Sequence, residues 1–365
     1  MSEEQLTLWQ NNYVDLVSNK LGAEALSCSD EFFAPKENLL KPEPSIFIPD
    51  KYTERGKWMD GWESRRSYGR IWRTESNEDY DWCIIRLGVP GSIVGVDIDT
   101  AHFKGNAPLT ATLEACSCDA SPTDSTTWTT IVDNQSLTPD SHNLFQALSN
   151  VDDVYTHVKL KIYPDGGVAR LRVYGSVAFN PMQFLPGELI DVAAVSNGGF
   201  ALTCSDMFFS HKNNLIMPGK GVNMGDGWET KRRRDPGPDW VIIKLGSPAT
   251  INKVLLDTQH FKGNYPDHFT LQAMNEGNSK ASSQDTITDD EKWLTIIGET
   301  PLFADREHLF IIHDPQHRQQ IFTHIKLNIF PDGGVSRLRV FGYLEQNKHE
   351  REVVIGLQDT FKPIA

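Results

Sequence analysis

The sequence has 365 residues, with 49 acidic and 35 basic side chains and a formal net charge of −14. This length corresponds to about two domains of roughly 150 residues. So acidic a surface argues against bulk binding to nucleic acid or to an anionic membrane. The five cysteines form no Cys-x-x-Cys pair, which favours free thiols in a reducing compartment over a disulfide framework.

Targeting signals are absent from the sequence pattern. No apolar run is long enough to span a bilayer, and residues 1–5 lack the basic and apolar parts of a signal peptide. We therefore expect a cytoplasmic protein. Cys116 and Cys118 are spaced too tightly for an ordinary zinc knuckle, so we interpret both as incidental.

Most of the chain follows the periodicity of strands. The stretch 9–20 indicates a helix, and beyond it apolar and polar residues alternate, as over 94–99, 157–162 and 170–173. Such runs are typical of antiparallel strands with one buried face. The Pro-Asp-Gly-Gly sequence at 164–167 is a turn, because Pro presets φ and Gly accepts a positive φ. The pattern predicts an all-β fold of jelly-roll β-sandwiches.

Several motifs occur twice in the same order, which indicates two tandem homologous domains. The matched ranges are 26–30 with 202–206, 38–40 with 214–216, 60–63 with 226–229, 81–82 with 239–240, 99–106 with 257–264, and 163–175 with 330–342. We predict a first repeat over residues 1–180, a second over 181–345, and a charged tail over 346–365 that could dock on a neighbouring subunit.

The first candidate site is the doubled Asp-Gly-Trp-Glu-x-x-Arg motif. Its members are Asp60, Trp62, Glu63 and Arg66 in the first copy and Asp226, Trp228, Glu229 and Arg232 in the second. The alternative is a structural turn in which Asp caps, Trp packs, and Glu pairs with Arg.

The second candidate site is a polar loop that follows an apolar strand. It contains Asp99, His102, Lys104 and Asn106, with Asp257, His260, Lys262 and Asn264 in the second copy. An Asp before a His can support a metal ion or orient the imidazole for acid–base chemistry. A histidine that is only hydrogen-bonded to its loop is the alternative.

The third candidate is the arginine pair that follows each Pro-Asp-Gly-Gly turn. Arg170 and Arg172, like Arg337 and Arg339, are two residues apart and therefore share one face of a strand. Two guanidinium groups on one face suit a carboxylate. A solvated basic face is the alternative.

Together these doubled motifs resemble those of the allantoicase family, over roughly residues 20–343. The resemblance implies two tandem β-sandwiches of the galactose-binding-like, jelly-roll kind that form homo-oligomers. It also implies conversion of allantoate and water to ureidoglycolate and urea in purine degradation. The first copy has a longer stretch at 67–80 than its counterpart, which we expect to change one loop and not the activity.

This reaction assigns roles to the candidate residues as a hypothesis. Arg66, or Arg170 with Arg172, would bind the substrate carboxylate; Glu63 or Asp99 would act as base and His102 as acid, with their second-copy counterparts in the same roles. A divalent metal ion held by Asp, Glu and His is an alternative way to activate water. The sequence does not decide whether one copy, both copies, or a site between them is active.

A non-catalytic module that binds a carbohydrate or another small ligand is the competing function. Sandwiches of this kind also bind sugars, and fold alone does not separate the two functions. A binding module would release no urea.

Overall fold

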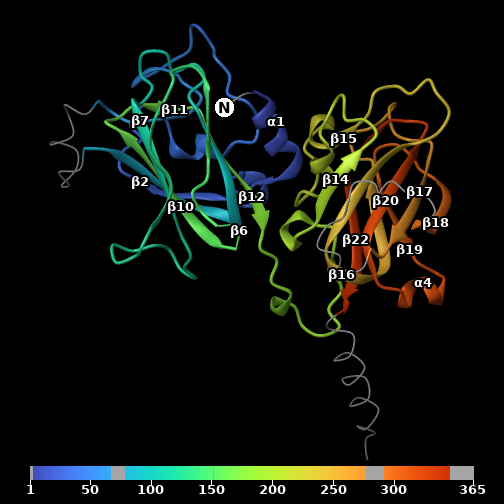
Figure 1. Ribbon diagram of the computed structural model, residues 1–365. Helices are drawn as coiled ribbons and strands as arrows, with labels where there is room; N and C mark the ends of the chain where they lie inside the picture. The colour runs from blue at the N-terminus through green and yellow to red at the C-terminus, as the bar shows by residue number, and fades with distance from the viewer. Residues whose placement is uncertain (1–2, 67–78, 151, 277–291, 346–365) are drawn as a thin grey trace, which may run out of the picture. The chain divides into compact units, whose positions relative to one another are not determined.

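The computed structural model describes residues 3–66, 79–150, 152–276 and 292–345. The chain divides into two compact units, residues 1–178 and 179–365 (Figure 1). Each unit contains one eight-stranded sheet and a short two-stranded pair, and a hairpin adds a further pair. The prediction of an all-β protein with two tandem β-sandwiches is confirmed. The predicted tail over 346–365, and residues 67–78 of the predicted longer loop, lie outside the described residues.

The first unit begins with a helix and continues as strands. Its elements are α1 (Glu3–Asn12), β1 (Val14–Asp15), β2 (Glu24–Cys28), β3 (Tyr52–Thr53), β4 (Gly56–Lys57), β5 (Trp62–Glu63), β6 (Asp81–Asp99), β7 (Thr110–Cys116), β8 (Thr129–Ser136), β9 (His142–Gln146), β10 (Tyr155–Tyr163), β11 (Gly167–Val168) and β12 (Arg170–Val177). The sheet order is β1-β12-β6-β10-β7-β8, and both β2 and β9 also pair with β6.

The second unit repeats this arrangement. Its elements are β13 (Ile190–Asp191), β14 (Phe200–Cys204), β15 (Trp228–Glu229), β16 (Asp239–Asp257), β17 (His268–Met274), β18 (Leu294–Pro301), β19 (Glu307–Ile311), α4 (Pro315–Gln319), β20 (Phe322–Phe330), β21 (Gly334–Val335) and β22 (Arg337–Leu344). The sheet order is β13-β22-β16-β20-β17-β18, with β14 and β19 also paired with β16.

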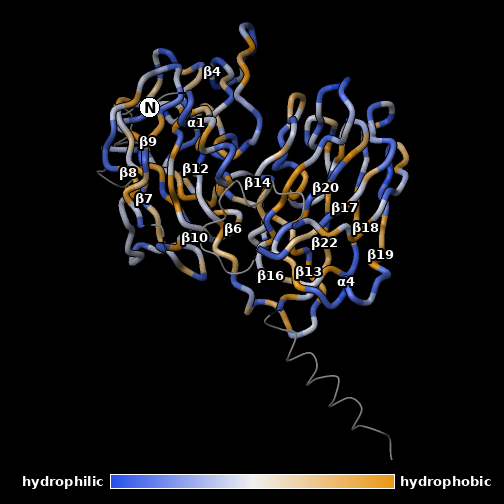
Figure 2. The backbone as a smooth tube through the Cα atoms, turned by 45° about the vertical axis from the view of Figure 1, so that its right-hand side comes forward, coloured by the Kyte–Doolittle hydropathy of each residue, from blue (hydrophilic) through white to orange (hydrophobic). Residues whose placement is uncertain are grey.

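One long strand in each unit serves both layers of the sandwich. The first part of β6 pairs with β10 through residues 81–86, and its last part pairs with β12 through 91–99. The register with β10 is irregular between Arg86 and Gly91, and the register with β12 is irregular between Ile93 and Gly95. Because the strand bends between its two sets of partners, the sheet folds over a shared core of alternating apolar side chains. Figure 2 shows these apolar positions along the strands of both units.

The N-terminal helix lies earlier than the sequence pattern indicated. A helix was expected over 9–20, but α1 ends at Asn12 and Val14–Asp15 forms an edge strand on β12. Trp9 is the one buried residue of α1, and its ring lies 5.9 Å from that of Tyr174. The helix therefore ends where the chain gains sheet hydrogen bonds. No helix among the described residues is long and apolar enough to cross a membrane.

The Pro-Asp-Gly-Gly turn brings the candidate motifs of each unit together. Gly166 has a φ of 129°, which suits glycine. A Cβ at Gly167 would lie 1.9 Å from the Phe103 ring, so only glycine allows this approach. Gly167 pairs with Glu63 in the β5–β11 ladder, and this pairing holds the glutamate beside the loop that follows β6.

Candidate active site

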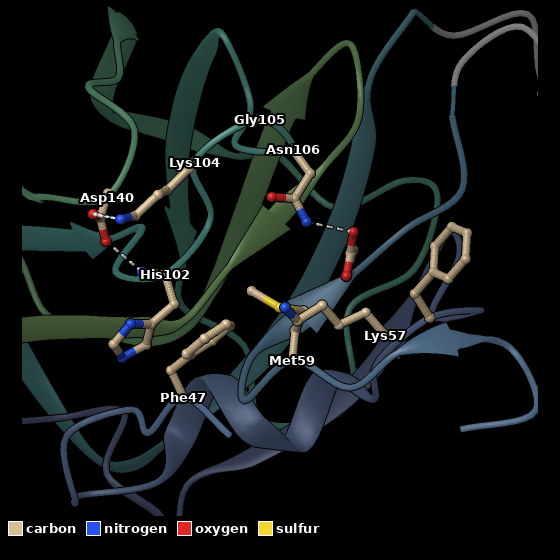
Figure 3. A pocket seen from close by; sticks show the side chains of 10 residues that line it. Phe47, Lys57, Met59, His102, Lys104, Gly105, Asn106 and Asp140 are labelled. Atoms are coloured by element: carbon tan, nitrogen blue, oxygen red, sulfur yellow. Dashed lines mark hydrogen bonds and ion pairs between the residues drawn. The ribbon is translucent and has the colours of Figure 1, made fainter. Parts of the chain in front are cut away.

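A pocket of about 630 Å³ opens at one end of the first unit (Figure 3). Its walls come from Phe33 after β2, from the segment 41–59, from β5, from the loop after β6 and from the loop before β9. The lining residues are Phe33, Phe47, Lys57, Met59, Glu63, His102, Lys104, Gly105, Asn106 and Asp140. Predicted residues from two separate motifs thus share one cavity.

Glu63 and Asn106 form the first polar wall of the pocket. The Asn106 side-chain amide donates a hydrogen bond of 2.8 Å to Glu63 Oε1 (Figure 3). Burial raises the pKa of Glu63, while the Asn106 hydrogen bond and the Arg66 charge oppose the rise. A carboxylate with a raised pKa is a stronger base than one in water, and Asn106 fixes its orientation.

His102 and Asp140 form the second polar wall. The backbone of His102 has a φ of 71°, an uncommon conformation for a residue with a side chain. Asp140 Oδ1 accepts the His102 backbone N–H at 2.7 Å and so supports this conformation. Strained backbone of this kind is frequent at functional sites.

The His102 ring has one nitrogen committed to the protein. Its Nε2 lies 3.1 Å from the carbonyl oxygen of Ser45, and a carbonyl only accepts hydrogen bonds. Nε2 therefore carries a proton, which leaves Nδ1 as the atom that can gain or lose one. The Phe47 ring stacks on the imidazole at 5.8 Å and covers one of its faces.

Two lysines line the cavity, and Arg66 lies next to its lining residues Glu63 and Gly105. Lys57 Nζ lies 4.4 Å from the centre of the Phe47 ring, and Lys104 Nζ lies 3.5 Å from Asp140 Oδ2. Arg66 lies beside them, with one guanidinium nitrogen 3.4 Å from Asp165 Oδ1 and the other donating to Gly105 O. Both lysines have exposed side chains and can reach an anion in the pocket.

Asp60, Arg170 and Arg172 lie beneath the pocket and not on its lining. Arg170 forms a buried ion pair with Asp60, 2.7 Å between Nη2 and Oδ2. Arg170 also donates to Glu43 O, and Arg172 donates to Pro42 O. The shared face of the two arginines thus holds the start of the segment that carries Phe47.

Trp62 and Asp99 are placed in the framework as well. Trp62 is fully buried and donates its indole N–H to Asp30 O at 2.8 Å, as Trp228 does to Asp206 O. Asp99 Oδ1 accepts the Ala101 backbone N–H at 2.8 Å, and Asp257 accepts that of Gln259 in the same way. These acids stabilise the turn that presents each histidine.

The second unit carries the same polar constellation. Asn264 donates to Glu229 Oε1 at 2.5 Å, and the His260 backbone, with a φ of 74°, donates to Asp305 Oδ1 at 2.7 Å. Lys262 lies 3.9 Å from Asp305. Beneath it, Arg337 pairs with Asp226 at 2.9 Å and Arg339 donates to the carbonyls of Met217 and Gly219.

The two copies differ in the segment that closes the pocket. Nineteen residues separate Leu40 from Asp60, whereas nine separate Ile216 from Asp226. The shorter segment contains no aromatic residue, and its one lysine, Lys220, pairs with Glu307 at 3.1 Å. Its Gly221 carbonyl lies 2.8 Å from His260 Nε2, as that of Ser45 does from His102, and Phe209 is 61% exposed. Arg232 lines a separate basic depression with Arg233 and Arg234.

Sequence reasoning missed Phe33, Phe47, Lys57, Met59 and Asp140. The length difference before Asp60 was a signal that the first copy has an added wall. Asp140 and Asp305 share a Leu-x-x-Asp pattern, at 137–140 and 302–305, which is a weaker signal.

The described residues contain one group of at least three His, Cys, Asp or Glu side chains whose ligand atoms converge, namely Cys116, Cys118 and His157. Asp99, His102 and Glu63 do not form such a group in the described part of the chain. The pocket residues instead offer a carboxylate, an imidazole and flanking cations.

Comparisons with known proteins agree on one family. The family model described as Allantoicase repeat matches residues 14–178 and 190–345. A probable allantoicase 1 of Burkholderia mallei is 46% identical over 347 residues, which cover 95% of this chain and 99% of that protein. The allantoicase of Dictyostelium discoideum is 44% identical, with coverage of 92% and 88%. The crystal structure of allantoicase from Saccharomyces cerevisiae superposes with a TM-score of 0.75 at 35% identity, covering 94% of this chain and 99% of that one.

Proposed function

The chain belongs to the allantoicase family, and we propose that it hydrolyses allantoate to ureidoglycolate and urea in the pocket of its first repeat. The observation that carries the choice of pocket is the meeting of Glu63–Asn106 with His102–Asp140 under the segment 41–59. The second copy has the polar groups under a shorter segment that lacks an aromatic residue. The reaction belongs to purine degradation through allantoin.

The chemistry requires three kinds of group. Allantoate is a carboxylate whose α-carbon bears two ureido groups, and one carbon–nitrogen bond breaks while a water molecule supplies the new hydroxyl. The departing urea nitrogen needs a proton, and the attacking water must lose one. The carboxylate needs positive charge close by.

Lys57 and Lys104 supply the positive charge for the carboxylate. Both line the cavity, and Lys57 comes from the segment 41–59, which is longer than its counterpart in the second repeat. Arg66 adds charge at the side of Glu63. From the sequence, Arg66 and the Arg170–Arg172 pair were alternatives for binding the substrate carboxylate. Arg170 and Arg172 donate to backbone carbonyls of the protein, which supports an indirect role for these two through the segment 42–46.

Glu63 acts as the general base. Burial raises its pKa, and the hydrogen bond from Asn106 Nδ2 occupies one side of the carboxylate. A carboxylate in this state accepts a proton from water more readily than an exposed one. Asn106 is thus a positioning residue for the base.

His102 acts as the general acid through Nδ1. Its Nε2 stays bonded to Ser45 O, and Phe47 limits rotation of the ring. The proton moves from Nδ1 to the nitrogen of the departing urea, and that from water moves to Glu63. His102 and Asn106 lie on different sides of the pocket, so acid and base can act on opposite sides of the α-carbon (Figure 3).

The cellular context is proposed on separate grounds. All five cysteines are free thiols, which supports a reducing compartment such as the cytoplasm. The exposed, edge-to-face rings of Phe208 and Phe209, 4.9 Å apart, support burial of this surface in a homo-oligomer. Light scattering on purified protein measures the oligomeric state.

The proposal is tested by kinetics of urea and ureidoglycolate release from allantoate. His102→Gln removes the acid and is expected to lower kcat by about 10²- to 10⁴-fold. The matched variant His260→Gln keeps a rate close to that of the unaltered chain. Equal losses in both variants would contradict the choice of pocket, and release of no urea by the unaltered folded protein would return the binding-module alternative.

A further inference from the structure

Three metal-ligating side chains meet at the end of the first sandwich that lies away from the pocket. Cys116 ends β7, Cys118 follows two residues later, and His157 lies on β10 directly opposite Cys116 in the sheet register. β7 has seven residues, so Cys116 lies roughly 20 Å along the strand from Thr110, near which the pocket loop arrives. These residues take no part in the chemistry described above.

The distances between the ligand atoms match those of one tetrahedral ion. Cys116 Sγ lies 3.9 Å from Cys118 Sγ, and Cys118 Sγ lies 3.4 Å from His157 Nδ1. Bonds of about 2.3 Å to sulfur and about 2.0–2.1 Å to nitrogen at tetrahedral angles require separations of roughly 3.8 Å and 3.5 Å. All three ligand atoms lie within 4.8 Å of one another. A single Zn²⁺ ion can therefore contact all three with little movement.

The protein framework orients these ligands without a metal ion. Thr156 Oγ1 accepts the Cys118 backbone N–H at 3.0 Å and lies 2.8 Å from His157 Nδ1. The Cys118 carbonyl lies 3.0 Å from the same hydroxyl and can accept its proton. A metal ion at Nδ1 takes the place of the contact between Nδ1 and the Thr156 hydroxyl, which then donates its proton to the Cys118 carbonyl. His157 and Cys116 are 3% and 4% exposed, so these two ligands are shielded from solvent.

The second repeat keeps the framework and lacks the thiols. Met274 lies opposite His324 as Cys116 lies opposite His157. The Glu276 backbone N–H donates to Thr323 Oγ1 at 3.0 Å, as that of Cys118 does to Thr156. The hydrogen-bonded framework is thus common to both copies, whereas the two sulfur ligands belong to the first.

We propose that Cys116, Cys118 and His157 bind one Zn²⁺ ion that stabilises the first repeat. Thiolate and imidazole ligands favour Zn²⁺ over the hard cations Mg²⁺ and Ca²⁺. Binding forms two zinc–sulfur bonds and one zinc–nitrogen bond and releases the two thiol protons to solvent. Cys118 is partly exposed, so water completes the coordination. Because the site is far from the pocket, the ion acts on stability and not on the hydrolysis step.

The test uses the full-length protein, reduced, stripped with a chelator and reconstituted with Zn²⁺ or Co²⁺ alone. We expect about one metal ion per chain by elemental analysis, and thiolate-to-cobalt charge-transfer bands in the Co²⁺ form. Cys118→Ser removes a partly exposed ligand and is expected to abolish both signals. Cys204→Ser alters a partly exposed thiol of the second repeat and keeps both.

Thermal unfolding supplies the second measurement. Chelation is expected to lower the Tm of the unaltered chain, while Cys118→Ser has the same Tm with and without chelator. The proposal is overturned by reduced protein that takes up neither metal, by Cys118→Ser that still shows the cobalt–thiolate bands, or by a Tm of the loaded protein that chelation leaves unchanged. None of these measurements depends on turnover of allantoate.

Discussion

The buried ion pair of Asp60 with Arg170 offers the most informative perturbation of the framework. Asp60 Oδ2 accepts from Arg170 and from the Ile46 backbone N–H at 3.1 Å, and Oδ1 accepts from Lys41 at 3.0 Å. Asp60→Asn keeps the size of the side chain but removes its charge and turns one acceptor into a donor. Arg170 is 2% exposed and would remain buried without a counter-ion.

The expected cost follows from this burial. Removing one partner of a buried pair costs about 3–5 kcal/mol, because the other charge is left uncompensated. We therefore expect the free energy of unfolding of the first repeat to fall by that amount in Asp60→Asn. The Ile46 backbone N–H and the Lys41 side chain lose their carboxylate acceptor, so we expect Phe47 and Lys57 to move and kcat/KM for allantoate to fall as well.

The second copy contains the matched control. Asp226→Asn breaks the equivalent pair with Arg337, which is also buried. We expect a similar loss of stability in the second repeat and a kcat/KM close to that of the unaltered chain. Denaturant unfolding followed by circular dichroism measures stability, and urea release measures activity at a temperature where both variants are folded. Unfolding of Asp60→Asn at the midpoint of the unaltered chain, or an equal loss of activity in the two variants, refutes the reasoning.

Three further predictions concern the pocket and its surroundings. Phe47→Ala uncovers the imidazole of His102 and one side of the cavity, so we expect kcat/KM for allantoate to fall. The Tm should change little, because Phe47 is 44% exposed. An unchanged kcat/KM would show that the longer segment has no role in the reaction. Because burial raises the pKa of Glu63, the acid limb of the profile of kcat/KM against pH should lie above the ordinary pKa range of glutamate. This limb should disappear in Glu63→Gln. An acid limb that persists in the variant would belong to another group. The hydrogen bond to Asp97 raises the pKa of His142 to about 9, so the stability that this pair contributes is present below the unfolded pKa near 6.5 and is lost as pH rises through 9. Because His142 is half-exposed and burial raises the pKa of Asp97, we discount the contribution to roughly 1 kcal/mol, and His142→Gln should remove this alkaline fall in the free energy of unfolding.

The sequence was sufficient for the architecture because its signals are local and doubled. Alternation of apolar residues along 157–162 and the Pro-Asp-Gly-Gly turn each specify strands without knowledge of distant contacts. The helix was misplaced because its single buried residue, Trp9, gives little periodicity, and the edge strand at Val14–Asp15 exists only through its pairing with β12.

The candidate site was only partly accessible from the sequence. Glu63 and Asn106 belong to repeated motifs, so duplication identified them, but their hydrogen bond depends on the β5–β11 ladder. Phe47 and Lys57 occur in the copy with the longer segment and therefore have no repeat to mark them. Arg170 and Arg172 were expected to bind a substrate carboxylate, whereas the carboxylate that Arg170 contacts is that of Asp60, 110 residues earlier in the chain.

Cys116 and Cys118 were interpreted as incidental because the sequence does not show which residue lies opposite them in the sheet. Two thiols with this spacing are an incomplete ligand set, and His157 joins them only because β10 pairs with β7. Both repeats have the hydrogen bond from a backbone N–H to the threonine hydroxyl, whereas only the first repeat has the two thiols.

The central claim is that the first-repeat pocket performs the hydrolysis with Glu63 as its base. The most direct measurement is the steady-state rate of urea release from allantoate by Glu63→Gln and by Glu229→Gln, each with intact folding by circular dichroism. The account predicts a loss in kcat of about 10²- to 10⁴-fold for the first variant and a nearly unchanged kcat for the second. A Glu63→Gln protein that still releases urea at the unaltered rate would contradict it, as would an equal loss in the two variants.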